Sequence, residues 1–164
     1  MKGLVVGPDF AMGKGREGTI DRLEVLGGEM GFSLTVVENL TLDRDEAVRS
    51  TNVRNALKAG DVSTVRSQLG RTYSLTGRVI KGAGRGSQLG FPTANIEVPA
   101  NLAIPADGIY ACFAIVDGQP LMAAVSIGTR PTFKDQDHAI EVFILDYTGA
   151  LYDRMLTIEF VQRI

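Results

Sequence analysis

The sequence predicts an incomplete α/β segment followed by a small all-β barrel, and three observations lead to this prediction. Before residue 72, apolar strand-like runs alternate with helical periodicity, which is typical of a parallel α/β sheet. After residue 72 the helical periodicity stops, and short β-rich segments follow, separated mostly by Gly, Pro or Asp. Five or six such segments at close spacing are typical of a closed antiparallel barrel. We therefore expect two domains, residues 1–71 and 72–164, with the boundary at Gly70-Arg71-Thr72.

The first domain begins with a strand–helix–strand pattern. Residues 2–6, KGLVV, form a short apolar run before the turn-prone GPDF, which predicts a buried parallel strand. Residues 32–37, FSLTVV, predict a second strand, and residues 19–30 predict a helix because their apolar side chains recur at helical spacing. Two strands and a few helices are too little for a complete α/β domain.

Two further helices are predicted just before the boundary. Ser50 or Thr51 is a suitable N-cap for a helix that ends at Gly60. Asp61 is a suitable N-cap for a second, short helix that ends at Gly70.

The second domain contains strand patterns throughout. The clearest alternation of a half-buried strand runs through Leu121, Ala123, Val125 and Ile127. The predicted strands are SLTGRVI (74–80), GIYACFAIV (108–116), PLMAAVSIG (120–128), AIEVFILD (139–146) and RMLTIEFV (154–161).

Composition excludes several classes of protein. The net charge of −2 provides no overall field that attracts nucleic acid or an anionic membrane, and no apolar run reaches the roughly 18 residues of a membrane span. The single cysteine, Cys112, has no partner for an internal disulfide and is expected in the core. The single histidine, His138, has no neighbouring His or Cys, which argues against a zinc site. Together these features predict a cytoplasmic protein.

The stretch GRVIKGAGRGSQLGFPTAN, residues 77–95, is the strongest candidate for a binding site. Backbone N–H groups in a glycine-rich loop can surround anionic oxygens, and Lys81 and Arg85 add positive charge. Pro92 stiffens the end of the loop ahead of Thr93 and Asn95, whose oxygens are hard ligands suited to Mg²⁺. A nucleotide–Mg²⁺ site is therefore one interpretation. The spacing fits neither of the generic phosphate-binding glycine motifs, so ordinary barrel turns are the alternative.

The same stretch resembles the GxVxxGxxRGxxLGFPTAN signature of riboflavin kinases. The segments that follow resemble the family in order: GIYACFAIV its GVYA strand, SIGTRPTF (126–133) its IGxRPTF turn, and IEVFILD (140–146) its glutamate-bearing strand. LYDRMLTIEF (151–160) resembles the next strand. The resemblance implies a six-stranded antiparallel barrel that moves the γ-phosphoryl group of ATP to the 5′-hydroxyl of riboflavin and so makes FMN.

The N-terminal residues resemble a second family, the bacterial FMN adenylyltransferases, which make FAD and precede riboflavin kinase on one chain. LVVGPDFAMGKGREG and RSTNVRNAL resemble two of its motifs, and they place Asp9, Phe10, Ser50, Thr51 and Arg54 at matching positions. The family's HxGH-like motif is absent from this sequence, as is its helix after the last barrel strand. We therefore expect residues 1–71 to be the C-terminal part of a nucleotidyltransferase-like α/β domain. Residues 72–164 are then a kinase barrel without its C-terminal helix.

The resemblance also implies the roles of individual residues. Thr93 and Asn95 are expected to hold Mg²⁺, and Glu141 to act as the catalytic base. The alternative for Glu141 is a solvent-facing strand residue. Many family members have His where this chain has Phe143, which affects the expected flavin pocket. The expected nucleotide-binding residues are Gly82, Arg85, Gly86, Gly90 and Thr93.

Other assignments stay open at the level of sequence. Arg130 and Lys134 are either a solvated turn or phosphate contacts, and Tyr110 and Phe133 either line a flavin pocket or belong to the core. The expected ligands are riboflavin or FMN and ATP or ADP with Mg²⁺, without nucleic acid or membrane. The alternatives to kinase activity are a flavin- or nucleotide-binding barrel without turnover, and residual FAD-forming adenylyltransferase activity. The sequence does not predict an oligomeric state.

Overall fold

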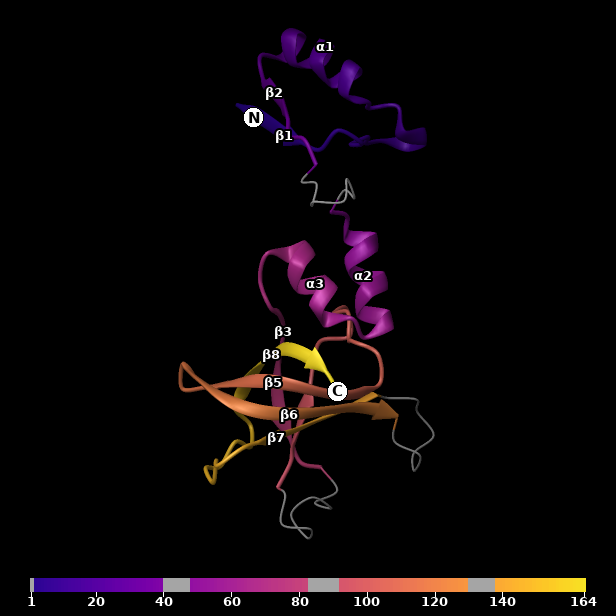
Figure 1. Cartoon of the computed structure of the whole chain (residues 1–164). Helices are drawn as coiled ribbons and strands as arrows, with labels where there is room; N and C mark the ends of the chain where they lie inside the picture. The colour runs from indigo at the N-terminus through magenta and orange to yellow at the C-terminus, as the bar shows by residue number, and fades with distance from the viewer. Residues whose placement is uncertain (1, 40–47, 83–91, 130–137) are drawn as a thin grey trace. The chain divides into compact units, whose positions relative to one another are not determined.

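The structure is a computed structural model that describes residues 2–39, 48–82, 92–129 and 138–164 (Figure 1). The chain forms two compact units, an N-terminal unit of Met1–Val48 and a barrel unit of Arg49–Ile164. This division lies earlier than the predicted boundary at residues 71 and 72. It places the two helices that precede Thr72 in the same unit as the barrel.

The N-terminal unit has the predicted strand–helix–strand arrangement. Strands β1 (Gly3–Val6) and β2 (Ser33–Val36) pair in parallel, and helix α1 (Ile20–Met30) connects them after a short 3₁₀ turn, η1 (Lys14–Arg16). Helix α1 ends at Gly31, whose left-handed backbone (φ 75°) suits a residue without a side chain. The sequence prediction of a small α/β segment is confirmed.

Helices α2 (Ser50–Ala59) and α3 (Val62–Leu69) form a hairpin that belongs to the barrel unit. The predicted N-cap of α2 is wrong: Arg49 occupies that position without a side-chain cap, and Ser50 already lies in the helix. The predicted C-cap Gly60 and N-cap Asp61 are confirmed. None of the helices in the described ranges has the length and apolar character that crossing a bilayer requires.

Among the α-helices of the described residues, α3 is the one whose N-cap side chain, Asp61, accepts a hydrogen bond from the helix backbone. The Oδ1 atom of Asp61 accepts hydrogen bonds from the Ser63 hydroxyl (2.6 Å) and the Thr64 backbone N–H (2.9 Å), and its Oδ2 atom accepts from the Thr64 hydroxyl (2.7 Å). These bonds, led by that from Ser63, stabilise the carboxylate and lower the pKa of Asp61 to about 2. The start of α3 is therefore determined by hydrogen bonds between residues that are close in sequence.

Within the described residues, six antiparallel strands close a barrel in the order β3-β4-β7-β6-β5-β8. This confirms the predicted architecture. The sequence did not predict β4, which is only four residues long. The strands are β3 (Tyr73–Ile80), β4 (Ala94–Glu97), β5 (Gly108–Val116), β6 (Gln119–Thr129), β7 (His138–Ile144) and β8 (Met155–Arg163).

The barrel interior is a continuous apolar core. Tyr110 and Phe160 are fully buried, with their rings edge to face at 5.4 Å, and Val62 of α3 belongs to the same cluster. Cys112 is buried among these residues, and burial raises the pKa of its thiol to about 12. Its predicted place in the core is correct.

The helical hairpin is attached to the barrel by specific polar contacts as well as by Val62. The Ala106 backbone N–H donates to the carbonyl of Leu57 (2.9 Å). The Arg163 guanidinium donates to the carbonyls of Ala59 (3.2 Å) and Asp107 (2.7 Å). These contacts join residues far apart in sequence, and they explain why the compact unit begins at Arg49.

Candidate functional site

Strand β4 places Asn95 on the outside of the barrel. Its neighbour Ile96 belongs to the core, so Asn95 points outward, yet only 5% of it is exposed. Gly82, two residues after the end of β3, lies against the Asn95 amide, because a Cβ atom added at Gly82 would lie 1.9 Å from Asn95 Nδ2. The missing side chain of Gly82 leaves room for a buried amide at this position.

Strand β7 brings Glu141 beside Asn95. Ile140 and Val142 are buried in the core, so Glu141 between them points outward and is half-buried. Glu141 lies directly opposite Asn95 in the β4–β7 ladder, and side chains at such positions have Cβ atoms about 4.5–5.5 Å apart. Among the described residues, the Glu141 carboxylate has no hydrogen-bond or ion-pair partner. The structure thus brings two predicted site residues together from distant parts of the sequence.

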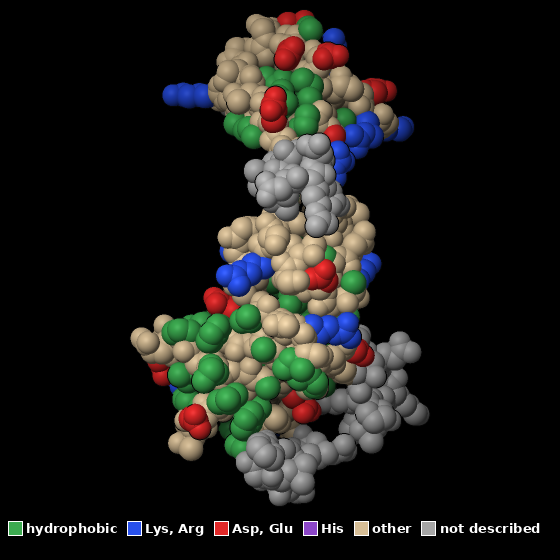
Figure 2. All heavy atoms as spheres, in the orientation of Figure 1, with side chains coloured by type: hydrophobic (Ala, Val, Ile, Leu, Met, Phe, Trp, Pro, Cys, Tyr) green, Lys and Arg blue, Asp and Glu red, His purple; other side chains and the backbone are tan. Residues whose placement is uncertain are grey.

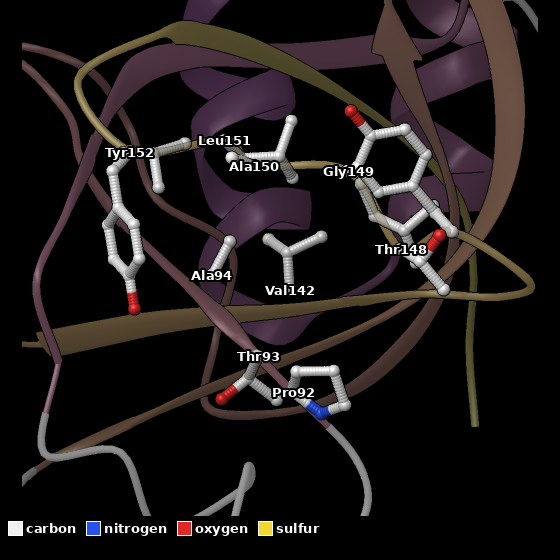
Figure 3. A pocket seen from close by; sticks show the side chains of 12 residues that line it. Pro92, Thr93, Ala94, Val142, Thr148, Gly149, Ala150, Leu151 and Tyr152 are labelled. Carbon is white, nitrogen blue, oxygen red and sulfur yellow. The ribbon is translucent and has the colours of Figure 1, made fainter.

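Thr93, two residues before Asn95, lies at the edge of a pocket of about 150 Å³. In Figure 3, Ala94 and Val142 lie between Thr93 and the segment of residues 147–152 that forms the opposite side. Tyr147, Leu151 and Tyr152 make much of this side apolar. The sequence analysis did not predict these lining residues.

Several predicted residues fall outside the described part of the chain. Arg85, Gly86 and Gly90 lie in 83–91, and Arg130, Phe133 and Lys134 lie in 130–137. Tyr110 is described, and its hydroxyl donates to the Ala106 carbonyl (2.5 Å) within the core. The core alternative for Tyr110 is therefore the correct one.

The predicted adenylyltransferase residues are divided between the two units. Asp9 and Phe10 follow β1 and line a shallow depression in the N-terminal unit, where Arg16 donates to the Asp9 carbonyl (3.0 Å). Ser50, Thr51 and Arg54 lie in the first turns of α2, where Arg54 donates to the Ser50 hydroxyl (3.4 Å).

The residues around Asn95 offer oxygen ligands rather than a dense acidic cluster. Within the described ranges, no group of three or more His, Cys, Asp or Glu side chains could hold a metal ion. The Thr93 hydroxyl, the Asn95 amide and the Glu141 carboxylate are hard oxygen donors, which suit a cation that shares its ligand shell with water and phosphate.

Comparison with known proteins matches two families to consecutive parts of the chain. A family model described as riboflavin kinase matches residues 69–164, and one described as FAD synthetase matches residues 1–52. The bifunctional riboflavin kinase/FMN adenylyltransferase of Pseudomonas fluorescens is 40% identical over 162 residues, and that of Bacillus subtilis (strain 168) is 37% identical over 164 residues. Each alignment covers 98% of this chain and 51% of the relative, so the chain spans about half the length of these curated relatives.

A solved structure shares the fold over almost the whole chain. The crystal structure of a protein described as a macrolide-efflux protein from Streptococcus pneumoniae superposes with a TM-score of 0.83 at 26% identity. The match covers 96% of this chain and 50% of that one. The family model matches residues 69–164, which include all six strands of the closed barrel. The same residues include the paired Asn95 and Glu141. The chain therefore belongs to the riboflavin kinase family.

Proposed function

We propose that this chain transfers the γ-phosphoryl group of ATP to the 5′-hydroxyl of riboflavin, giving FMN and ADP. The observation that carries the proposal is the pairing of Asn95 with Glu141 on the outer face of a barrel of this family. The buried Asn95 amide provides a ligand oxygen, and the Glu141 carboxylate provides a proton acceptor on the neighbouring strand. Phosphoryl transfer depends mainly on positioning and charge neutralisation, which such a site can provide.

Glu141 is the general base in this proposal. As the 5′-oxygen of riboflavin forms its bond to the γ-phosphorus, the bond from that phosphorus to the β–γ bridging oxygen breaks, and ADP leaves. The hydroxyl proton passes to the Glu141 carboxylate. The outward and half-buried position of Glu141 supports this role, because the carboxylate is accessible and has no competing partner among the described residues.

Thr93 and Asn95 are the residues that would hold Mg²⁺. The absence of a side chain at Gly82 supports this assignment, because it lets the Asn95 amide lie where a β-carbon of residue 82 would be only 1.9 Å from its Nδ2 atom. When bound, the cation would neutralise charge on the nucleotide phosphates.

We propose that the two substrates bind on opposite sides of the Asn95–Glu141 pair. The pocket that Thr93 shares with Tyr147 and Tyr152 has the mixed apolar and aromatic lining that suits the nucleotide. The outer face of β5 and β6 exposes Ile109, Phe113 and Met122, and hydrophobic side chains gather on the barrel surface in Figure 2. Such a surface suits the apolar dimethylbenzene side of the flavin ring system. A cytoplasmic location stays a prediction of the sequence.

Replacing Asn95 by Ala is expected to weaken Mg·ADP binding by about 10–100-fold, the usual effect of losing a group that supports a metal site. Isothermal titration with Mg·ADP measures the change, and Asn101→Ala, in an exposed turn, is the control. Equal Mg·ADP affinity in Asn95→Ala and in the parent chain would remove Asn95 from the metal site.

A coupled assay of ADP release tests the proposed function. The chain with Mg·ATP is expected to release ADP only when riboflavin is added, and one FMN should form for each ADP. The Pseudomonas fluorescens relative serves as the positive control. Binding of riboflavin and Mg·ADP without ADP release would instead identify a binding barrel without turnover.

A further inference from the structure

Ser126 lies in the same cross-strand row as Asn95 and Glu141. Glu141 pairs with Asn95 on one side and with Ser126 on the other, so the three residues occupy neighbouring strands β4, β7 and β6. Val125 and Ile127 are buried in the core, which directs Ser126 outward like Glu141. The carboxylate therefore has the Asn95 amide on one flank and the Ser126 hydroxyl on the other.

The surroundings of Ser126 leave its hydroxyl accessible. The residue is exposed, and its outward-facing neighbours along β6 are the small residues Ala124 and Gly128. A Cβ atom added at Gly128 would meet no described atom within 4 Å. Across the next strand pair, Ser126 faces Ile109, which is 46% exposed and forms part of the apolar outer face. The hydroxyl thus lies between a carboxylate and an apolar surface.

We infer that Ser126 is a substrate-binding residue that selects which hydroxyl of riboflavin is phosphorylated. The inference rests on the proposed function and adds a specificity residue to the same site. The ribityl chain carries hydroxyls on adjacent carbons, and Ser126 and Glu141 present adjacent polar groups in register. When the Ser126 hydroxyl hydrogen-bonds the 4′-hydroxyl, the terminal 5′-hydroxyl is left beside Glu141 to give up its proton.

The test compares riboflavin with 4′-deoxyriboflavin, which lacks the hydroxyl assigned to Ser126. The parent chain is expected to favour riboflavin by about tenfold in kcat/KM, the usual effect of one hydrogen bond. In Ser126→Ala this preference should fall to about onefold, because only the value for riboflavin decreases. Ser126→Thr keeps a hydroxyl and should retain a clear preference.

The chain offers a matched control in Ser74. Ser74 also lies opposite a half-buried glutamate, Glu159, but in the β3–β8 pair. Ser74→Ala should leave the preference between the two flavins unchanged. An equal loss of kcat/KM for both flavins in Ser126→Ala would indicate a purely structural role and overturn the inference, as would no loss for either.

A binding measurement keeps the inference separate from the proposed kinase activity. Quenching of flavin fluorescence gives dissociation constants for both flavins without any turnover. If the parent chain forms no FMN, the proposed function fails. A tenfold binding preference for riboflavin that disappears in Ser126→Ala would still support the role of Ser126, and the same preference in both proteins would contradict it.

Discussion

The first turnover of Glu141→Gln is expected to be slower than that of the parent chain by about 10²–10⁴-fold, the usual contribution of a general base. Glutamine keeps the size of the side chain and much of its hydrogen bonding but does not accept the proton. Riboflavin and Mg·ADP should therefore bind with little change. Rapid-quench measurement of a single turnover separates this chemical step from product release.

Glu159→Gln is the matched control for this experiment. Glu159 is also a half-buried strand glutamate, but it lies on β8 between Ser74 and Phe113, and Asn95 is not among its strand partners. The single-turnover rate of Glu159→Gln should stay within a few-fold of that of the parent chain. A parent-like single-turnover rate in Glu141→Gln would leave the proton acceptor unassigned and would favour the alternative that Glu141 is an ordinary surface residue.

Replacing Gly77 by Ala is expected to lower the free energy of unfolding of the barrel unit by about 3 kcal/mol, at the upper end of the cost of overpacking. A Cβ atom at Gly77 would lie 2.3 Å from the Glu97 carbonyl oxygen and 2.5 Å from Ile96 Cγ2. The first of these contacts is with backbone, so a change of side-chain rotamer cannot relieve it. The β3–β4 pair would have to separate next to the candidate site.

Urea unfolding followed through tyrosine signals measures this effect. The chain has no Trp, and its four tyrosines all lie in the barrel unit, so the signal reports that unit. Gly128→Ala is the control, because the added Cβ would meet no described atom, and its stability should change by no more than about 0.5 kcal/mol. Equal stability of Gly77→Ala and Gly128→Ala would mean that β4 approaches β3 less closely than described.

Strands with regular alternation could be predicted from the sequence, whereas β4 could not. The segments of β5, β6 and β8 have enough alternating residues to show a period of two, and Gly or Asp marks their ends. Strand β4 has four residues, Ala94–Glu97, and follows a glycine-rich loop and a proline, so local pattern favours a loop. Its strand geometry depends on pairing with β3 and β7, which are distant in sequence.

The position of Asn95 illustrates what sequence pattern leaves out of a site. Its chemistry as a hard ligand could be predicted from residue type and from the resemblance. Its burial depends on Gly82, and its closeness to Glu141 depends on strand register. The start of the barrel unit at Arg49, earlier than predicted, also depends on contacts between residues distant in sequence. Arg163 donates to the Ala59 carbonyl, and Ala106 donates to the Leu57 carbonyl.

Transfer of labelled phosphate into flavin tests the central claim most directly. The chain is incubated with riboflavin and ATP labelled in the γ-phosphoryl group, and the flavins are separated by chromatography. We expect the label in FMN, with one ADP formed for each FMN, and almost none after the same time in Glu141→Gln. Unlabelled flavin from the folded parent chain, or label that accumulates equally in Glu141→Gln, would contradict the proposal that this outer face of the barrel carries out phosphoryl transfer.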